Sequence, residues 1–85
     1  MNFIKPAVES INVDGIEYKN PLMNLDTVIT IKKMQSTATP PKYFAIQFIC
    51  IDGNDYLWQY VNHHEMRSVY DKIMNYIAKN ANNEM

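Results

Sequence analysis

Apolar and polar positions alternate along the first part of the chain, a pattern that is typical of strands. Residues 8–13 and 16–19 each alternate in this way, and Asp14-Gly15 lies between them. Asp-Gly between two alternating segments favours a tight hairpin turn. Asn20-Pro21 ends this hairpin, because proline cannot donate to a β-ladder and restricts the residue before it.

A third strand is expected over residues 27–34. Its centre, Val28-Ile29-Thr30-Ile31, is β-branched throughout, which disfavours a helix and suits a pleated surface. The following segment, Gln35–Lys42, is predicted to be a loop because Pro40-Pro41 prevents regular strand pairing.

An aromatic hairpin is predicted next, with strands over residues 43–51 and 55–61 joined around Asp52-Gly53-Asn54. The length of this loop fixes the register, and a shift of one residue moves every side chain to the other face. A loop of two or four residues sets Ile49 opposite Trp58, whereas a three-residue loop sets Phe48 opposite Trp58.

We favour the three-residue loop, with Gln47 opposite Gln59 and with Asn54 in the left-handed conformation that asparagine tolerates. This register collects seven apolar or aromatic side chains on one face of the hairpin: Phe44, Ile46, Phe48, Cys50, Tyr56, Trp58 and Tyr60.

A helix is predicted over residues 63–79, with residues 80–85 as a polar tail. Apolar residues recur there at spacings of three and four, which gives one apolar stripe: Met66, Val69, Tyr70, Ile73, Met74 and Ile77. Asn62 is a suitable N-cap, and Glu65 follows it at the spacing of a capping box.

Together these elements predict an α+β fold in a single domain, residues 1–85: an antiparallel, four- to five-stranded curved sheet or half-barrel packed by one C-terminal amphipathic helix. A helix of about 17 residues is roughly 25 Å long and covers only one sheet face. The opposite face still carries an aliphatic set, Ile49, Ile51, Leu57 and Val61. Either this set is an interaction patch, or residues 1–23 fold over it.

Composition narrows the class of protein. The chain has 85 residues, 47% of them hydrophobic, and a net charge of −1. Such a balance favours folding around one core and lacks the clustered basic charge of duplex-binding proteins. Cys50 is the only cysteine, so no disulfide within the chain is possible. No signal peptide and no apolar run long enough to span a bilayer is present, and we expect a cytoplasmic protein without membrane contact.

Candidate chemistry is sparse. His63-His64-Glu65 is the only cluster of metal-ligand residue types, but adjacent helical side chains diverge and Glu65 is placed for capping. We find no nucleophile, histidine and acid in a catalytic spacing and no glycine-rich phosphate loop. The sequence therefore predicts no enzyme, no metal site and no cofactor, with a solvated helix start at His63 and His64.

The order of these motifs resembles a group of short bacterial and phage proteins, several of which look like minimal pleckstrin-homology-like domains. The resemblance covers roughly residues 24–77 and rests on strand, turn and helix motifs: Asn24-Leu25-Asp26-Thr27-Val28, Ile31-Lys32-Lys33, Tyr43-x-x-Ile46-x-Phe48, Asp52-Gly53, Trp58-x-Tyr60 and Arg67-x-x-Tyr70-x-x-Ile73. It implies neither an activity nor functional residues. The long Gln35–Lys42 loop departs from it.

Two functions follow as hypotheses. The first is a non-catalytic protein-interaction domain that binds an unidentified protein or a second copy, as a homodimer, through Ile49, Ile51, Leu57 and Val61. The second is a binder of single-stranded nucleic acid or a small ligand, in which Tyr56, Trp58 and Tyr60 form a stacking face beside Lys32, Lys33 and Lys42. A covering helix would make the three rings core, and we therefore favour the first.

Overall fold

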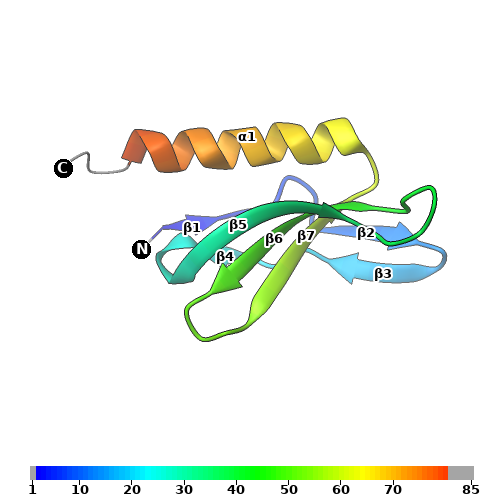
Figure 1. Ribbon diagram of the computed structural model, residues 1–85, viewed down its shortest axis with the longest axis horizontal. Helices are drawn as coiled ribbons and strands as arrows, with labels where there is room; N and C mark the ends of the chain where they lie inside the picture. The colour runs from blue at the N-terminus through cyan, green and yellow to red at the C-terminus, as the bar shows by residue number, and fades with distance from the viewer. Residues whose placement is uncertain (1, 81–85) are drawn as a thin grey trace.

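The structure is a computed structural model that describes residues 2–80. Seven strands, one 3-10 turn and one helix follow one another along the chain: β1 (Phe3–Ile4), β2 (Ser10–Val13), β3 (Ile16–Lys19), β4 (Met23–Asn24), η1 (Leu25–Thr27), β5 (Val28–Gln35), β6 (Phe44–Cys50), β7 (Asp55–Tyr60) and α1 (His63–Asn80). The α+β class, the antiparallel pairing and the C-terminal helix are therefore confirmed (Figure 1). Of the expected tail, 80–85, all but Asn80 lies outside the described residues.

The strands form three small sheets where we expected one curved sheet of four or five strands. β5, β6 and β7 make a three-stranded sheet, while β2 pairs with β3 and β1 pairs with β4. The expected continuity fails beside β7, where β3 ends and the chain passes Asn20-Pro21 before β4 begins. Proline has no amide hydrogen, and the asparagine side chain takes the place of a backbone partner there.

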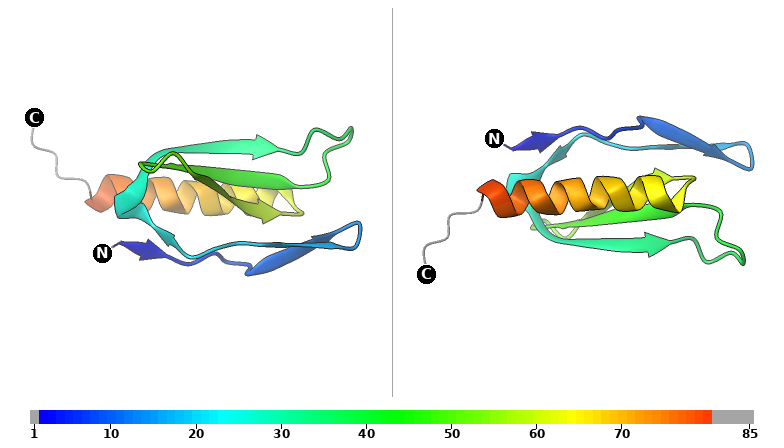
Figure 2. Two further views of the ribbon diagram at one scale, coloured as in Figure 1. Left: turned by 90° about the horizontal axis from the view of Figure 1, so that it is seen from below. Right: turned by 90° about the horizontal axis from the view of Figure 1, so that it is seen from above.

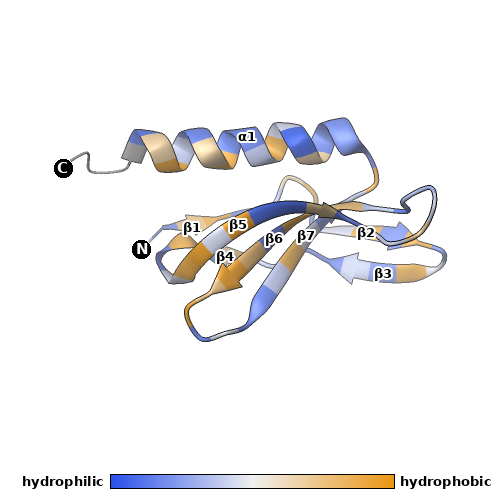
Figure 3. Cartoon of the chain, viewed as in Figure 1, coloured by the Kyte–Doolittle hydropathy of each residue, from blue (hydrophilic) through white to orange (hydrophobic). Residues whose placement is uncertain are grey.

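The helix covers one face of the three-stranded sheet (Figure 1). Seen from below or above, α1 runs along the middle of the molecule, with β5 on one side and the N-terminal strands on the other (Figure 2). Apolar residues recur along α1 and along the strands beneath it (Figure 3). The helix and the sheet thus enclose one core together with Met23: Ile46, Phe48, Cys50, Trp58, Tyr60, Met66, Val69 and Ile73.

The β6–β7 hairpin has the expected face but not the expected pairs. Cys50 and Asn54 are hydrogen-bonded across the turn, so the loop is Ile51-Asp52-Gly53, one residue earlier than predicted. Gly53 has a φ of +88° and takes the left-handed position that we assigned to Asn54, because glycine has no Cβ to clash there. Phe48 consequently lies opposite Tyr56 and not Trp58, although the Phe48 and Trp58 rings still meet edge to face at 4.9 Å.

The first residues of α1 are held by Asn62. Its side-chain oxygen accepts hydrogen bonds from the backbone N–H groups of His64 at 2.8 Å and Glu65 at 3.3 Å. These are two of the amide groups that have no partner within a helix. Asn62 therefore fixes where the helix begins and, with it, the position of Met66 over the sheet.

Candidate interaction surface at the edge of strand β7

Asn20 joins the β2–β3 hairpin to the three-stranded sheet through its side chain. The amide nitrogen donates to the carbonyl oxygens of Val8 at 2.7 Å and Gln59 at 3.1 Å, and the amide oxygen accepts from the Gln59 backbone N–H at 2.7 Å. Asn20 and Gln59 are both buried. The carboxamide therefore satisfies both backbone groups of Gln59, as a neighbouring strand would do.

The remainder of the β7 edge has no such partner. Backbone groups of an antiparallel strand point alternately to its two sides, so Asp55 and Leu57 face the same side as Gln59. No hydrogen bond to these outward backbone groups is present among residues 2–80. Two consecutive outward-facing positions of β7 are thus open to a further strand.

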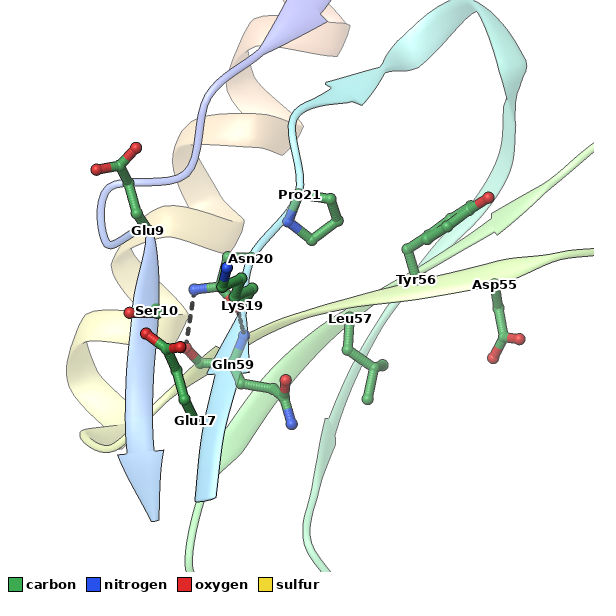
Figure 4. Close-up of a pocket in the computed structure, with 10 residues that line it drawn as sticks. All are labelled: Glu9, Ser10, Glu17, Lys19, Asn20, Pro21, Asp55, Tyr56, Leu57 and Gln59. Atoms are coloured by element: carbon green, nitrogen blue, oxygen red, sulfur yellow. Dashed lines mark hydrogen bonds between the residues drawn. The ribbon is translucent and has the colours of Figure 1, made fainter. Parts of the chain in front are cut away.

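Two grooves follow this edge. The first, which we call the edge groove, has a volume of about 780 Å³ and lies between the β2–β3 hairpin and β7 (Figure 4). The second, the apolar groove, has a volume of about 470 Å³ and extends towards the β6–β7 turn. Pro21 and Tyr56 line both grooves, so the two adjoin along β7.

The edge groove is acidic. Three exposed carboxylates, those of Glu9, Glu17 and Asp55, line it together with one lysine, Lys19. The Asp55 carboxylate accepts a hydrogen bond from the Gln47 side chain at 2.8 Å, which holds it on the outer face of the sheet. The groove thus presents net negative charge beside the open backbone of β7.

The apolar groove is rimmed by large exposed side chains. Phe3, Leu22, Ile51 and Tyr56 line it and are between 40% and 69% exposed. They come from β1, the β3–β4 connection, the β6–β7 turn and β7. We call these four residues the apolar rim.

The predicted patch does not form one surface. Ile49 and Leu57 lie on the outer sheet face and are half-buried. Ile51 lies in the turn at one end of the hairpin and Val61 follows β7 at the other, and both are exposed. Only Ile51 belongs to the apolar rim, while Leu57 lines the edge groove.

The predicted stacking face is mostly core. Trp58 is 1% exposed and Tyr60 is 0% exposed, which leaves only Tyr56 partly accessible. The Trp58 indole N–H donates to the Pro21 carbonyl oxygen at 2.6 Å. Lys33, one of the lysines expected beside the stacking face, instead has its ammonium nitrogen 4.9 Å from the centroid of the Tyr70 ring. Bases cannot stack on rings that lie beneath a helix, because stacking requires exposed π-faces.

Burial also changes the acidity of one core side chain. The hydroxyl of Tyr60 is buried and makes no hydrogen bond among the described residues. Loss of hydration raises the pKa of Tyr60 to about 12, although the nearby Ala7 backbone offsets part of this rise. Tyr60 is therefore a neutral core residue over the physiological pH range.

The histidines at the start of α1 make ring contacts. The rings of His63 and Phe44 meet edge to face with their centroids 5.0 Å apart, and the centroids of the His63 and His64 rings lie 6.0 Å apart. Within residues 2–80, no group of three or more histidine, cysteine or acidic side chains is placed to hold a metal ion. None of the described helices is both long and apolar enough to cross a membrane.

Comparison with known proteins gives no relative for this chain: no family model, no curated protein and no solved structure matches it. The resemblance to pleckstrin-homology-like domains therefore stays a prediction.

Proposed function

We propose that this chain is a small, non-catalytic protein-interaction domain of the cytoplasm, and that the apolar rim is its contact surface. One observation carries the proposal: four of the nine large apolar side chains that are exposed within residues 2–80 gather around a single groove. Scattered exposed apolar residues are ordinary, whereas apolar residues collected around a groove are typical of interaction sites.

The position of the groove supports the same role. It lies beside β7, whose outward backbone groups at Asp55 and Leu57 are unpaired among the described residues. An interface there would combine apolar contact with main-chain hydrogen bonds, which is the usual basis of peptide recognition at a sheet edge. The three-stranded sheet would then gain a fourth strand in the complex, supplied by the partner.

The test uses two exposed isoleucines as a matched pair. Ile51 lies in the apolar rim, and Ile29 lies on β5 away from both grooves; they are 69% and 64% exposed. The wild-type domain is immobilised and used to select linear peptides from a random displayed library. Enriched peptides are then synthesised and titrated against Ile51→Lys and Ile29→Lys.

Ile51→Lys is expected to weaken binding by about tenfold or more, because burial of an isoleucine side chain contributes about 1.5–3 kcal/mol. Ile29→Lys is expected to bind as the wild type does. Failure to enrich any peptide, or equal loss in both variants, would contradict the proposal. Light scattering over a range of concentrations tests a second copy as partner, which predicts an increase in mass that Ile51→Lys abolishes.

A further inference from the structure

We propose that the β7 edge binds its partner by strand addition, and that the added segment is extended and positively charged. This inference rests on the proposed function and names the kind of partner: a cationic stretch of another protein that lies in the edge groove and pairs with the backbone of Asp55 and Leu57. We call this segment the guest strand.

Asn20 indicates where the guest strand lies. Its carboxamide already binds both the N–H and the C=O of Gln59, as the backbone of a neighbouring strand does. Two residues earlier on the same side, Leu57 offers the same pair of groups, and the groove opens beside it. The guest strand would therefore continue the line of contacts that Asn20 begins and would end against Asn20.

The charge of the groove selects the chemistry of the partner. Glu9, Glu17 and Asp55 outnumber Lys19 among its ionisable side chains. A lysine or arginine on the guest strand would meet these carboxylates, whereas an acidic segment would be repelled. Side chains of the guest strand that point to the other face would lie towards Tyr56, which belongs to the apolar rim and lines both grooves.

The other edge of the same sheet is less suited to this role. β5 carries Lys32 and Lys33, and lysines along an edge strand oppose pairing with a further strand. The β5 edge therefore opposes a further strand, whereas the β7 edge can accept one. β7 alone combines an adjoining acidic groove with apolar side chains.

The test uses defined peptides. The first is a capped peptide of about seven residues in which valine and lysine alternate, long enough to pair with Asp55 and Leu57 and to extend past Asp55. The second has glutamate in place of lysine, and the third carries N-methyl groups on alternate backbone nitrogens of the first. Binding to the wild-type domain is followed by the amide signals of the protein in solution NMR.

The valine–lysine peptide is expected to shift the Asp55 and Leu57 amides and to slow their hydrogen exchange. We expect N-methylation, or glutamate in place of lysine, to weaken binding by about tenfold or more. Raising the salt concentration to about 0.5 M weakens the lysine peptide, since the groove carboxylates are exposed and screened. The double variant Glu9→Gln, Glu17→Gln loses affinity for it, and the control Asp71→Asn, on the exposed side of α1, does not.

Leu57→Pro tests the main-chain hydrogen bond between Leu57 and the guest strand by a change in the protein. Its backbone nitrogen faces the groove and not β6, so proline removes the donor without removing a bond of the β6–β7 ladder. The variant is expected to lose the peptide while retaining the fluorescence of buried Trp58. If it does not fold, the N-methylated peptide still decides the question.

The proposal is overturned if the lysine peptide does not bind, if N-methylation leaves its affinity unchanged, or if saturation leaves the Asp55 and Leu57 amides unaltered. These outcomes are separable from failure of the proposed function. Library peptides that depend on Ile51 but ignore Leu57→Pro would leave the apolar rim as the contact surface without strand addition. Loss of both results would remove both proposals.

Discussion

Replacing Asn20 with alanine tests how strongly one side chain joins the two parts of the fold. The change removes three hydrogen bonds: those to the Val8 carbonyl, the Gln59 carbonyl and the Gln59 N–H. Gln59 is buried, so its backbone N–H would have no partner. The two carbonyl groups are less demanding, because a buried carbonyl without a partner is tolerated better than a buried N–H.

An unsatisfied buried donor costs about 1–3 kcal/mol. With a smaller contribution from the two carbonyls, we expect Asn20→Ala to lower the free energy of unfolding by about 3 kcal/mol. The whole domain is expected to have about 4–13 kcal/mol, from about 0.05–0.15 kcal/mol per residue. A loss of this size would lower Tm by about 12–24 °C, at about 4–8 °C per kcal/mol.

The assay is urea unfolding followed by the fluorescence of Trp58, the single tryptophan, which packs next to this junction. At an m-value of about 1–2 kcal/mol/M, the midpoint should fall by about 1.5–3 M. Asn12→Ala is the control: Asn12 is an exposed asparagine of the same hairpin, and its change should stay within about 0.5 kcal/mol. A loss below about 1 kcal/mol in Asn20→Ala would refute the assignment of the junction to this side chain.

A second substitution separates donor from acceptor. Asn20→Asp retains an oxygen for the Gln59 N–H but places a carboxylate against the two carbonyl oxygens. Its pKa should rise above the unfolded value of about 3.9, so the folded state binds more protons and the stability of the variant falls as pH rises through the raised pKa. Acidification from pH 7 to pH 5 should therefore stabilise Asn20→Asp relative to the wild type.

Substitutions at three further positions test single features of the fold. Tyr60→Phe should be as stable as the wild type at pH 7 and more stable at pH 12. The tyrosine ionises near pH 10 in the unfolded chain and near 12 in the folded one, so the free energy of unfolding of the wild type falls by roughly 2–3 kcal/mol across that interval. Urea titrations at several pH values measure this loss. Asn62→Ala should lower the free energy of unfolding by about 1 kcal/mol, because it removes the helix cap. Asn62→Asp should retain most of the wild-type stability in the same titration. An unchanged stability in Asn62→Ala would contradict the capping role. Gly53→Ala should lower the free energy of unfolding by about 1 kcal/mol from backbone strain alone, since φ is +88° and no neighbouring group lies within 4 Å of an added Cβ. Gly53→Asn should lower it by less, and thermal unfolding measures both.

The elements with local signals could be predicted from the sequence. Asp14 and Gly15 both have positive φ, as the tight hairpin turn requires, and dipeptide identity alone indicates that conformation. The helix is set by the spacing of its apolar residues and by Asn62. The face of β6 and β7 that meets the helix follows from alternation together with a loop of three residues, and this length is kept although the loop begins one residue earlier than expected.

The junctions between elements could not be predicted, because their partners are distant in the chain. Asn20 and Gln59 are 39 positions apart, and the pattern around Asn20-Pro21 indicates only that a strand ends. β1 and β4 have two residues each, too few to show a period. The expected single sheet is therefore not confirmed, although most of its strands were expected.

The candidate surface was missed for a related reason. Ile49 and Leu57 share the outer face, as alternation requires, but Phe3 and Leu22 join Ile51 only through tertiary packing. Because the loop begins at Ile51 and not at Asp52, Ile51 lies in the turn and not in the strand where it was expected. No periodic pattern marks residues that four different segments bring together.

The burial of Cys50 gives the molecule an internal probe of its own opening. This sole thiol is 4% exposed and lies in the cluster that α1 closes. The same residue lines the apolar groove, so a thiol-modifying reagent reaches it when the packing around that groove loosens, because the reacting group is the accessible thiolate. For an opening free energy of about 6 kcal/mol, modification should be roughly 10⁴ times slower than in the urea-unfolded chain. The rate would thus report the rare opening of this end of the core under native conditions, without any added label.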